Sequence, residues 1–218
     1  MRRATQRTFQ PGDHICAVYS GTAELARIGA DFLVQGLKNQ ERCWYVATGD
    51  EHSAIVGALR RRRIDVKHEM QRGALDILDG SAAYVVHGEF NPERTVATFS
   101  DAIEAALKDG FNGFRAVAEM SWALAVKNGA QRVIAYEALL RSLFATSRAT
   151  GLCLYDRTRM PLNVLNGALV THPIAGVNGR FRTNPYYSPD AHTPPARGAD
   201  VRAKLRALSD SASPSRKR

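Results

Sequence analysis

The sequence predicts an α/β fold of three layers, in which helices cover both faces of a mostly parallel central sheet and a hairpin lies at one edge. Five short, dense apolar runs have the length of buried strands, and longer stretches with apolar residues at helical spacing separate them. Strands separated by helices pair in parallel, and right-handed crossovers place the helices on both faces. Asn178-Gly179 is typical of a tight hairpin turn.

The expected strands alternate with the expected helices. Thr22 is the expected N-cap of the first helix, and residues 91–93 (Asn-Pro-Glu) supply a cap, a first-turn proline and a first-turn acid for a later helix. A long helix is expected to end at Gly151, and Pro161 begins a shorter one. The strands are expected at His14–Tyr19, Arg42–Thr48, Gly73–Leu78, Phe114–Ala118 and Leu152–Asp156.

Positive charge is concentrated at the two ends of the chain. The 218 residues contain 30 Lys and Arg against 21 Asp and Glu, a formal net charge of +9. Residues 11–189 carry 20 bases and 18 acids, so this segment is nearly neutral. We expect a disordered basic N-terminus (1–10), a folded domain (11–189) and a basic, mostly disordered tail (190–218) with one short amphipathic helix through Val201 and Leu208.

The composition excludes several classes of protein. With 44% apolar and 23% charged residues, the chain is neither wholly disordered nor fibrous. Three cysteines without a C-x-x-C pair argue against a secreted disulfide scaffold and favour a reducing cytoplasm. The N-terminus does not resemble a signal peptide, and no segment approaches the ~20 apolar residues that span a bilayer, so neither export nor membrane insertion is expected.

The motifs of the best-known α/β enzymes are absent from the sequence. A phosphate-binding loop reads G-x-x-x-x-G-K-[ST], but the chain contains no Gly-Lys pair, and Glu24 in the turn after the first strand would repel a phosphate. A G-x-G-x-x-G after a strand, a G-x-S-x-G elbow and an H-E-x-x-H pair are also absent. We therefore expect no catalytic residues and no enzymatic activity.

Ten short motifs, in a fixed order, carry a resemblance to a known family. Together they resemble a MEDS domain, the sensory domain of methanogens and methylotrophs, from residue 12 to about residue 189. The motifs are Gly12–Cys16 with Tyr19, Phe32–Leu37, Glu41–Tyr45, Gly73–Leu75, Phe114-Arg115, Glu119–Trp122, Tyr136-Glu137, Leu152–Asp156, Thr171–Pro173 and Asn184–Tyr187.

The resemblance implies a degenerate relative of the RecA/KaiC nucleotide-binding fold that has lost its phosphate loop. It also implies a cytoplasmic sensor of small hydrocarbon derivatives, such as halomethanes, methanol or ketones. In the family the domain is often joined to DNA-binding, histidine-kinase or anti-sigma-type modules. This sequence shows no helix-turn-helix or kinase pattern, so we expect output through a separate regulatory protein, and signalling by association is compatible with a homodimer.

Polar and aromatic residues at the ends of the expected strands form a candidate ligand site. Ligands of parallel α/β sheets bind beyond the carboxyl ends of the strands, and a carboxylate between aromatic walls suits a small, weakly polar molecule. The alternative is that the aromatic residues pack in the core and that Glu119 pairs with Arg115 or another base. The candidate ligand-binding residues are His14, Cys16, Tyr19, Asp50, Glu119, Trp122 and Tyr155.

Histidine and cysteine residues give a second candidate site. His14 and Cys16 share one face of the first strand because side chains alternate along a strand. With Cys153 and His172 they offer nitrogen and sulfur ligands to a soft metal. The spacing is too scattered for a zinc motif, and buried thiols beside a hydrogen-bonded histidine are the simpler interpretation, so no cofactor is predicted.

The run Arg60, Arg61, Arg62 and Arg63 is a candidate partner surface. Four consecutive bases suit nucleic acid or an acidic protein, but they are also typical of a solvated helix end, where bases interact favourably with the helix dipole. Two alternative functions therefore remain open besides that of a sensor. One is a nucleotide-binding RecA-like relic without hydrolysis, and the other is an adaptor that binds nucleic acid or an acidic partner through the arginine run and the tails. The nearly neutral core itself is not expected to bind nucleic acid.

Overall fold

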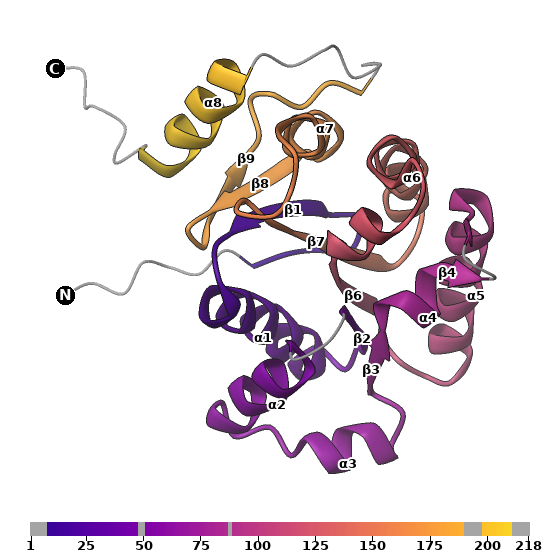
Figure 1. The fold of residues 1–218 in the computed structure, drawn as a ribbon. Coiled ribbons are helices and arrows are strands. Elements are labelled where there is room, and N and C mark those ends of the chain that lie inside the picture. Colours follow the sequence, from indigo (N-terminus) through magenta and orange to yellow (C-terminus); the bar gives the residue numbers. More distant parts are fainter. Residues whose placement is uncertain (1–7, 48–50, 87–88, 190–197, 211–218) are drawn as a thin grey trace, which may run out of the picture.

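The computed structural model describes residues 8–47, 51–86, 89–189 and 198–210. Seven of its strands form one sheet in the order β3-β2-β6-β7-β1-β8-β9 (Figure 1). All neighbouring strands of this sheet pair in parallel except β8 and β9, which form an antiparallel hairpin. The strands are β1 (His14–Tyr19), β2 (Arg42–Ala47), β3 (Leu75–Asp79), β6 (Phe114–Glu119), β7 (Ala149–Asp156), β8 (Ile174–Val177) and β9 (Arg180–Thr183).

Helices cover both faces of this sheet, which confirms the predicted three-layer α/β fold with an edge hairpin (Figure 1). One face carries α1 (Thr22–Lys38), α2 (Glu51–Arg61) and α3 (Val66–Gln71). A short ladder of β4 (Val85–Val86) and β5 (Glu89–Phe90) joins α4 to α5. The other face carries α4 (Gly80–Tyr84), α5 (Pro92–Lys108), the 3-10 helix η1 (Met120–Ala125), α6 (Gly129–Ala145), α7 (Leu162–Thr171) and α8 (Gly198–Asp210).

Alternation of side chains along the strands divides the buried residues between two cores. In β1, Ile15, Ala17 and Tyr19 pack on the α1 side of the sheet, whereas Cys16 and Val18 pack on the α6 side. The central strands β1, β6 and β7 are buried along their whole length, as expected for strands covered on both faces. This alternation also decides on which face each candidate site residue lies.

Two of the predicted helix ends are wrong. Gly151 does not end a helix but lies inside β7, which begins at Ala149. A Cβ atom at Gly151 would lie 2.4 Å from the ring of Phe144 in α6. Glycine at this position therefore allows the Phe144 ring to pack directly on β7. Thr22 is not an N-cap but the first residue of α1, and Gly21, with φ of 77°, stands at the cap position.

Other predicted elements are confirmed. Asn91 caps α5 by accepting a hydrogen bond from the backbone N–H of Arg94 at 2.8 Å. The amphipathic helix expected through Val201 and Leu208 is α8, in which these two residues are buried, so folded structure extends past residue 189. Among the described residues, no helix has the length and apolar character that crossing a membrane requires.

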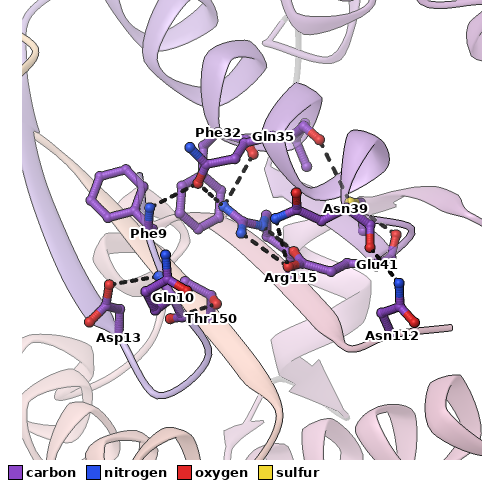
Figure 2. Close-up of polar contacts among 12 residues, drawn as sticks. Phe9, Gln10, Asp13, Phe32, Gln35, Asn39, Glu41, Asn112, Arg115 and Thr150 are labelled. Carbon is purple, nitrogen blue, oxygen red and sulfur yellow. Dashed lines mark hydrogen bonds and ion pairs between the residues drawn. The ribbon is translucent and has the colours of Figure 1, made fainter. Parts of the chain in front are cut away.

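A buried ion pair ties β6 to α1 and to the residue before β2 (Figure 2). Arg115 is 0% exposed; its Nε donates to Oε2 of Glu41 at 2.5 Å, and its Nη1 donates to Oε1 of Gln35 at 2.9 Å. The guanidinium lies 4.5 Å from the ring centre of Phe32. A Cβ atom at Gly36 would lie 2.6 Å from Cδ of Arg115, so α1 needs glycine there.

Candidate functional site

The structure divides six of the seven candidate ligand residues between the two faces of the sheet, so these six do not surround a single crevice. Asp50 lies outside the described residues. The other six are buried, none more than 3% exposed. They separate because odd and even positions of a strand face opposite ways. Tyr19 and Glu119 lie on the α1 face, and His14, Cys16, Trp122 and Tyr155 lie on the α6 face.

Glu119 is surrounded by hydrogen-bond donors at the carboxyl edge of the sheet. The hydroxyl of Tyr19 donates to its Oε1 at 3.0 Å, and the backbone N–H and hydroxyl of Ser121 donate to its two oxygens at 2.9 and 2.7 Å. The predicted alternative of a pair with Arg115 is therefore wrong, since Arg115 binds Glu41. Burial raises the pKa of Glu119 above its ordinary value, against the opposing effect of these hydrogen bonds.

The turn after β1 holds a carboxylate where a nucleotide-binding fold would hold phosphate. Oε2 of Glu24 accepts a hydrogen bond from the backbone N–H of Ser20 at 2.9 Å. The nearest Nη of Arg157 lies 3.9 Å from the same oxygen. The side chain of Glu24 thus occupies a backbone donor in the turn between β1 and α1, a kind of donor that phosphate-binding turns use for their ligand.

Four buried side chains converge between β1, β7, α6 and the end of α7. One ligand-type atom from each lies within 4.8 Å of all the others: two histidine nitrogens, a carboxylate oxygen and a sulfur. Nε2 of His14 and Nε2 of His172 lie 3.1 and 3.2 Å from Oε2 of Glu137. Sγ of Cys153 lies 3.5 Å from this oxygen and 3.8 Å from Nε2 of His14. We call these four residues the His-Cys-Glu cluster.

The cluster contains three of the four residues named as weak metal candidates. Cys16 pairs with Cys153 in the sheet register but is not a member, and Glu137 takes its place. Glu137 was not predicted as a ligand, although Tyr136-Glu137 is one of the motifs that carry the family resemblance. The available signal was that Glu137 follows Tyr136 on a core helix, where both side chains are buried. An acidic side chain is costly to bury without a partner, so such a position indicates a polar partner nearby.

Burial and mutual contacts perturb the ionisation of the cluster. Burial and the neighbouring His172 lower the pKa of His14 to about 4. Burial alone would raise the pKa of Glu137, but the two imidazoles outweigh it, and this pKa lies well below its ordinary value. Burial and the Glu137 carboxylate raise the pKa of the Cys153 thiol. The lowered pKa favours the ionised form of the buried Glu137 carboxylate.

Trp122 belongs to an aromatic part of the core. Its ring stacks on Tyr84 with centroids 4.3 Å apart and meets the edge of Phe90 at 4.5 Å. Its indole Nε1 is buried and has no hydrogen-bond partner within the described part of the chain. This placement is the core packing that the alternative interpretation of the sequence expected.

A cavity of about 250 Å³ lies between the carboxyl-terminal halves of β2 and β3 and the helices α4 and α5. Trp44 and Phe99, with ring centroids 5.7 Å apart, form aromatic walls. The indole N–H of Trp44 donates to Oδ2 of Asp76 at 2.9 Å, which fixes the ring against the strand. We call this space the Trp44 cavity; its lining residues are Trp44, Val46, Leu78, Asp79, Ala83, Thr95, Thr98 and Phe99.

None of the cavity residues was a candidate ligand residue in the sequence. The cavity depends on how α4 and α5 pack over the sheet, and α4 was not predicted because its five residues carry no helical pattern. The signal that could have found it is Trp44, a large aromatic residue that is only half-buried in a strand whose neighbours Cys43 and Tyr45 are fully buried.

The arginine run is not a uniform exposed patch. Arg60, Arg61 and Arg63 are exposed, whereas Arg62 lies against α1 and donates from Nε to Oδ1 of Asp31 at 2.6 Å. Arg62 therefore joins α2 to α1. The binding of a partner by the three exposed arginines stays a prediction.

Comparisons with known proteins identify the family of the chain. The family model described as MEDS, "MEthanogen/methylotroph, DcmR Sensory domain", matches residues 13–173, from the start of β1 to the residue after His172. The transcriptional repressor DcmR of Methylorubrum extorquens is 30% identical over 129 residues, which are 57% of this chain and 44% of the repressor. The chain thus matches less than half the length of this relative. The family model, by contrast, covers most of the present chain. The chain therefore belongs to the MEDS sensory-domain family.

Proposed function

We propose that this chain is a sensor domain without catalytic activity that binds a small, weakly polar organic molecule in the Trp44 cavity and signals to a separate transcription regulator. The sensory family supports the first part of this proposal. The similarity to a transcriptional repressor supports the second. The observation that supports the choice of site is the cavity itself, because the six expected ligand residues that the structure describes are packed in the core.

The size of the Trp44 cavity favours a ligand of few atoms. Its volume of about 250 Å³ lies below the range of roughly 300–1,000 Å³ that is typical of pockets for drug-sized molecules. A C1–C4 alcohol, ketone or halocarbon is small enough to enter. Such compounds are the hydrocarbon derivatives that the family resemblance implies as ligands.

The lining of the cavity suits the same chemistry. Trp44 and Phe99 offer aromatic surfaces that remove carbon or halogen atoms from water. The hydroxyls of Thr95 and Thr98 donate to backbone carbonyls one turn earlier in α5, at 2.9 and 3.1 Å, and each oxygen retains a lone pair for a donor on the ligand. Asp79 adds a carboxylate at the end of β3.

A ligand in this cavity would contact elements that are far apart in the sequence. It touches β2 and β3 on one side and α4 and α5 on the other. A molecule that fits only one arrangement of these elements shifts the population toward that arrangement, since a ligand acts through its different affinities for two conformations. The helix surfaces of α4 and α5 would then report occupancy to the partner.

We also infer that the domain is a RecA/KaiC-like relative that no longer binds nucleotide. The support is the β1–turn–α1 unit, in which Glu24 accepts the backbone donor of Ser20. Calorimetry with ATP and Mg²⁺ at millimolar concentration should show no binding. Saturable binding of ATP would instead favour the nucleotide-binding alternative.

The ligand is tested by thermal shift and calorimetry of the full chain against C1–C4 alcohols, ketones and halocarbons. A ligand at 100 times its Kd stabilises a protein by about 2.7 kcal/mol, which is a measurable rise in melting temperature. Ala83→Leu fills the cavity and should abolish the response. Ala97→Leu makes the same change at an exposed position of α5 outside the cavity lining and should preserve it.

Two results would overturn the proposal. One is folded wild-type protein that responds to no member of the panel. The other is a response that Ala83→Leu leaves unchanged, which would place the ligand elsewhere in the protein.

A further inference from the structure

We propose that the His-Cys-Glu cluster is a closed zinc site, in which Nε2 of His14, Nε2 of His172, Sγ of Cys153 and Oε2 of Glu137 bind one Zn²⁺ ion. The inference is independent of the Trp44 cavity, which is lined by other residues. It begins from the donor set: two imidazole nitrogens, one sulfur and one carboxylate oxygen are ligands that zinc takes in proteins. All four side chains are buried, three of them on strands or helices of the central core.

Four of the six distances among these atoms are close to the edges of a tetrahedron around zinc. With Zn–N and Zn–O near 2.0–2.2 Å and Zn–S near 2.3 Å, a tetrahedral site has N···O edges of about 3.3 Å and edges to sulfur of about 3.5 Å. The two nitrogen-to-oxygen distances are 3.1 and 3.2 Å. The distances from Sγ of Cys153 to Glu137 and His14 are 3.5 and 3.8 Å. The other pairs of ligand atoms lie within 4.8 Å of each other, so some ligands move closer together when they enclose an ion.

Hydrogen bonds around the cluster orient two of the ligands for a metal. Nδ1 of His172 lies 2.8 Å from the carbonyl oxygen of Ala168, which can only accept, so this nitrogen carries the proton. In a neutral ring Nε2 then has its lone pair directed at Glu137, an arrangement that needs a cation between them or a proton on the ring. Tyr155 donates to Oε1 of Glu137 and leaves Oε2 for the cluster. Metal-bound histidines and carboxylates typically have such outer partners.

The remaining histidine is also compatible with a ligand role. Nδ1 of His14 is buried and has no hydrogen-bond partner in the part of the chain that the structure describes. The ring can hold its proton on Nδ1 and direct the lone pair of Nε2 toward the other three ligand atoms. His14 and His172 lie with ring centroids 3.9 Å apart, so the two Nε2 atoms reach the same space.

Charge distinguishes the zinc site from a plain hydrogen-bonded network. Zn²⁺ with one thiolate, one carboxylate and two neutral imidazoles has no net charge, which is favourable in a buried site. The alternative is a metal-free network of hydrogen bonds and ion pairs among the same four side chains. The presence or absence of the metal separates these two states.

Four protein ligands leave no open position, so the site is structural. It joins the start of β1, the middle of β7, α6 and the residue that follows α7. Zinc would thus link the helices of one face to two central strands. Its removal should lower the melting temperature of the full chain.

The test is metal analysis of the full chain, expressed without a His-tag, together with cobalt substitution. We expect about one equivalent of zinc per chain. The Co²⁺ form of the wild-type protein should show the absorption of a tetrahedral site with a thiolate-to-cobalt charge-transfer band. Cys153→Ser should lose that band and most of the metal, whereas Cys16→Ser, a change of an equally buried cysteine on the neighbouring strand, should retain both.

The outcomes separate the two states through measurements on the wild-type protein as well as on the variants. Folded wild-type protein that contains no zinc, and binds neither zinc nor cobalt after exposure to a chelator, would show a metal-free network and overturn the proposal. So would a cobalt spectrum without a thiolate band, or one that Cys16→Ser removes. These outcomes do not depend on whether a ligand binds in the Trp44 cavity.

Discussion

Glu41→Gln should strongly destabilise the protein because it leaves Arg115 charged in the core. Arg115 is 0% exposed and Glu41 is 5% exposed, and the two side chains form the buried ion pair shown in Figure 2. Removal of one partner of a buried ion pair costs about 3–5 kcal/mol, because the other charge remains without compensation. The amide of Gln35 and the ring of Phe32 still contact the guanidinium, so the lower part of that range is expected.

The control for this prediction is Glu69→Gln. Glu69 pairs with Arg72 at 2.5 Å, but this arginine side chain is 37% exposed and the pair lies on the surface of the protein. Its loss should cost less than ~1 kcal/mol. Urea unfolding measures both free energies, and for a chain of this size a loss of 3 kcal/mol lowers the melting temperature by about 10 °C.

A double variant refines the same experiment. Glu41→Leu with Arg115→Met replaces both charges with apolar side chains and should recover much of the stability that Glu41→Gln loses. The reasoning is refuted if Glu41→Gln costs no more than Glu69→Gln, or if the double variant is less stable than Glu41→Gln.

Three further predictions test the packing, the ionisation and the surface. Gly36→Ala should destabilise by about 1–3 kcal/mol because its Cβ would overlap Arg115, whereas Gly57→Ala, whose Cβ meets nothing nearer than 3.4 Å, should be neutral or stabilising in urea unfolding. Burial raises the pKa of Glu119, so the folded state holds this proton more tightly and wild-type stability falls as pH rises from about 4.5. The unfolding free energy of Glu119→Gln minus that of the wild type should therefore increase as the pH rises above about 4.5. A difference that does not change with pH would contradict this prediction. Reversing Arg60 and Arg63 to Glu should leave the ligand response unchanged, because both lie outside the cavity lining.

The sequence was sufficient for the class of the fold. Dense apolar runs marked the central strands because those strands are covered on both faces, and Asn178-Gly179 marked the hairpin. The cap and proline at Asn91-Pro92 located the start of α5. These signals are local, so they can be recognised without knowledge of the tertiary structure.

The site was less predictable because it depends on which elements meet. The alternation of β1 was visible in the sequence, and it already placed Tyr19 on the face opposite to His14 and Cys16. The orientation of α6, which brings Glu137 to His14, was not visible. Nor was the packing of α4 and α5 that opens a space beside Trp44.

The central claim is that a small organic molecule binds in the Trp44 cavity. The most direct measurement is the crystal structure of the full chain soaked with a bromine-containing halomethane, because the anomalous scattering of bromine locates the ligand without prior assumptions. We predict a bromine peak between Trp44 and Phe99 that is absent from crystals of Ala83→Leu. Bromine bound only outside the cavity, or no bromine in crystals that tolerate the compound, would contradict the account.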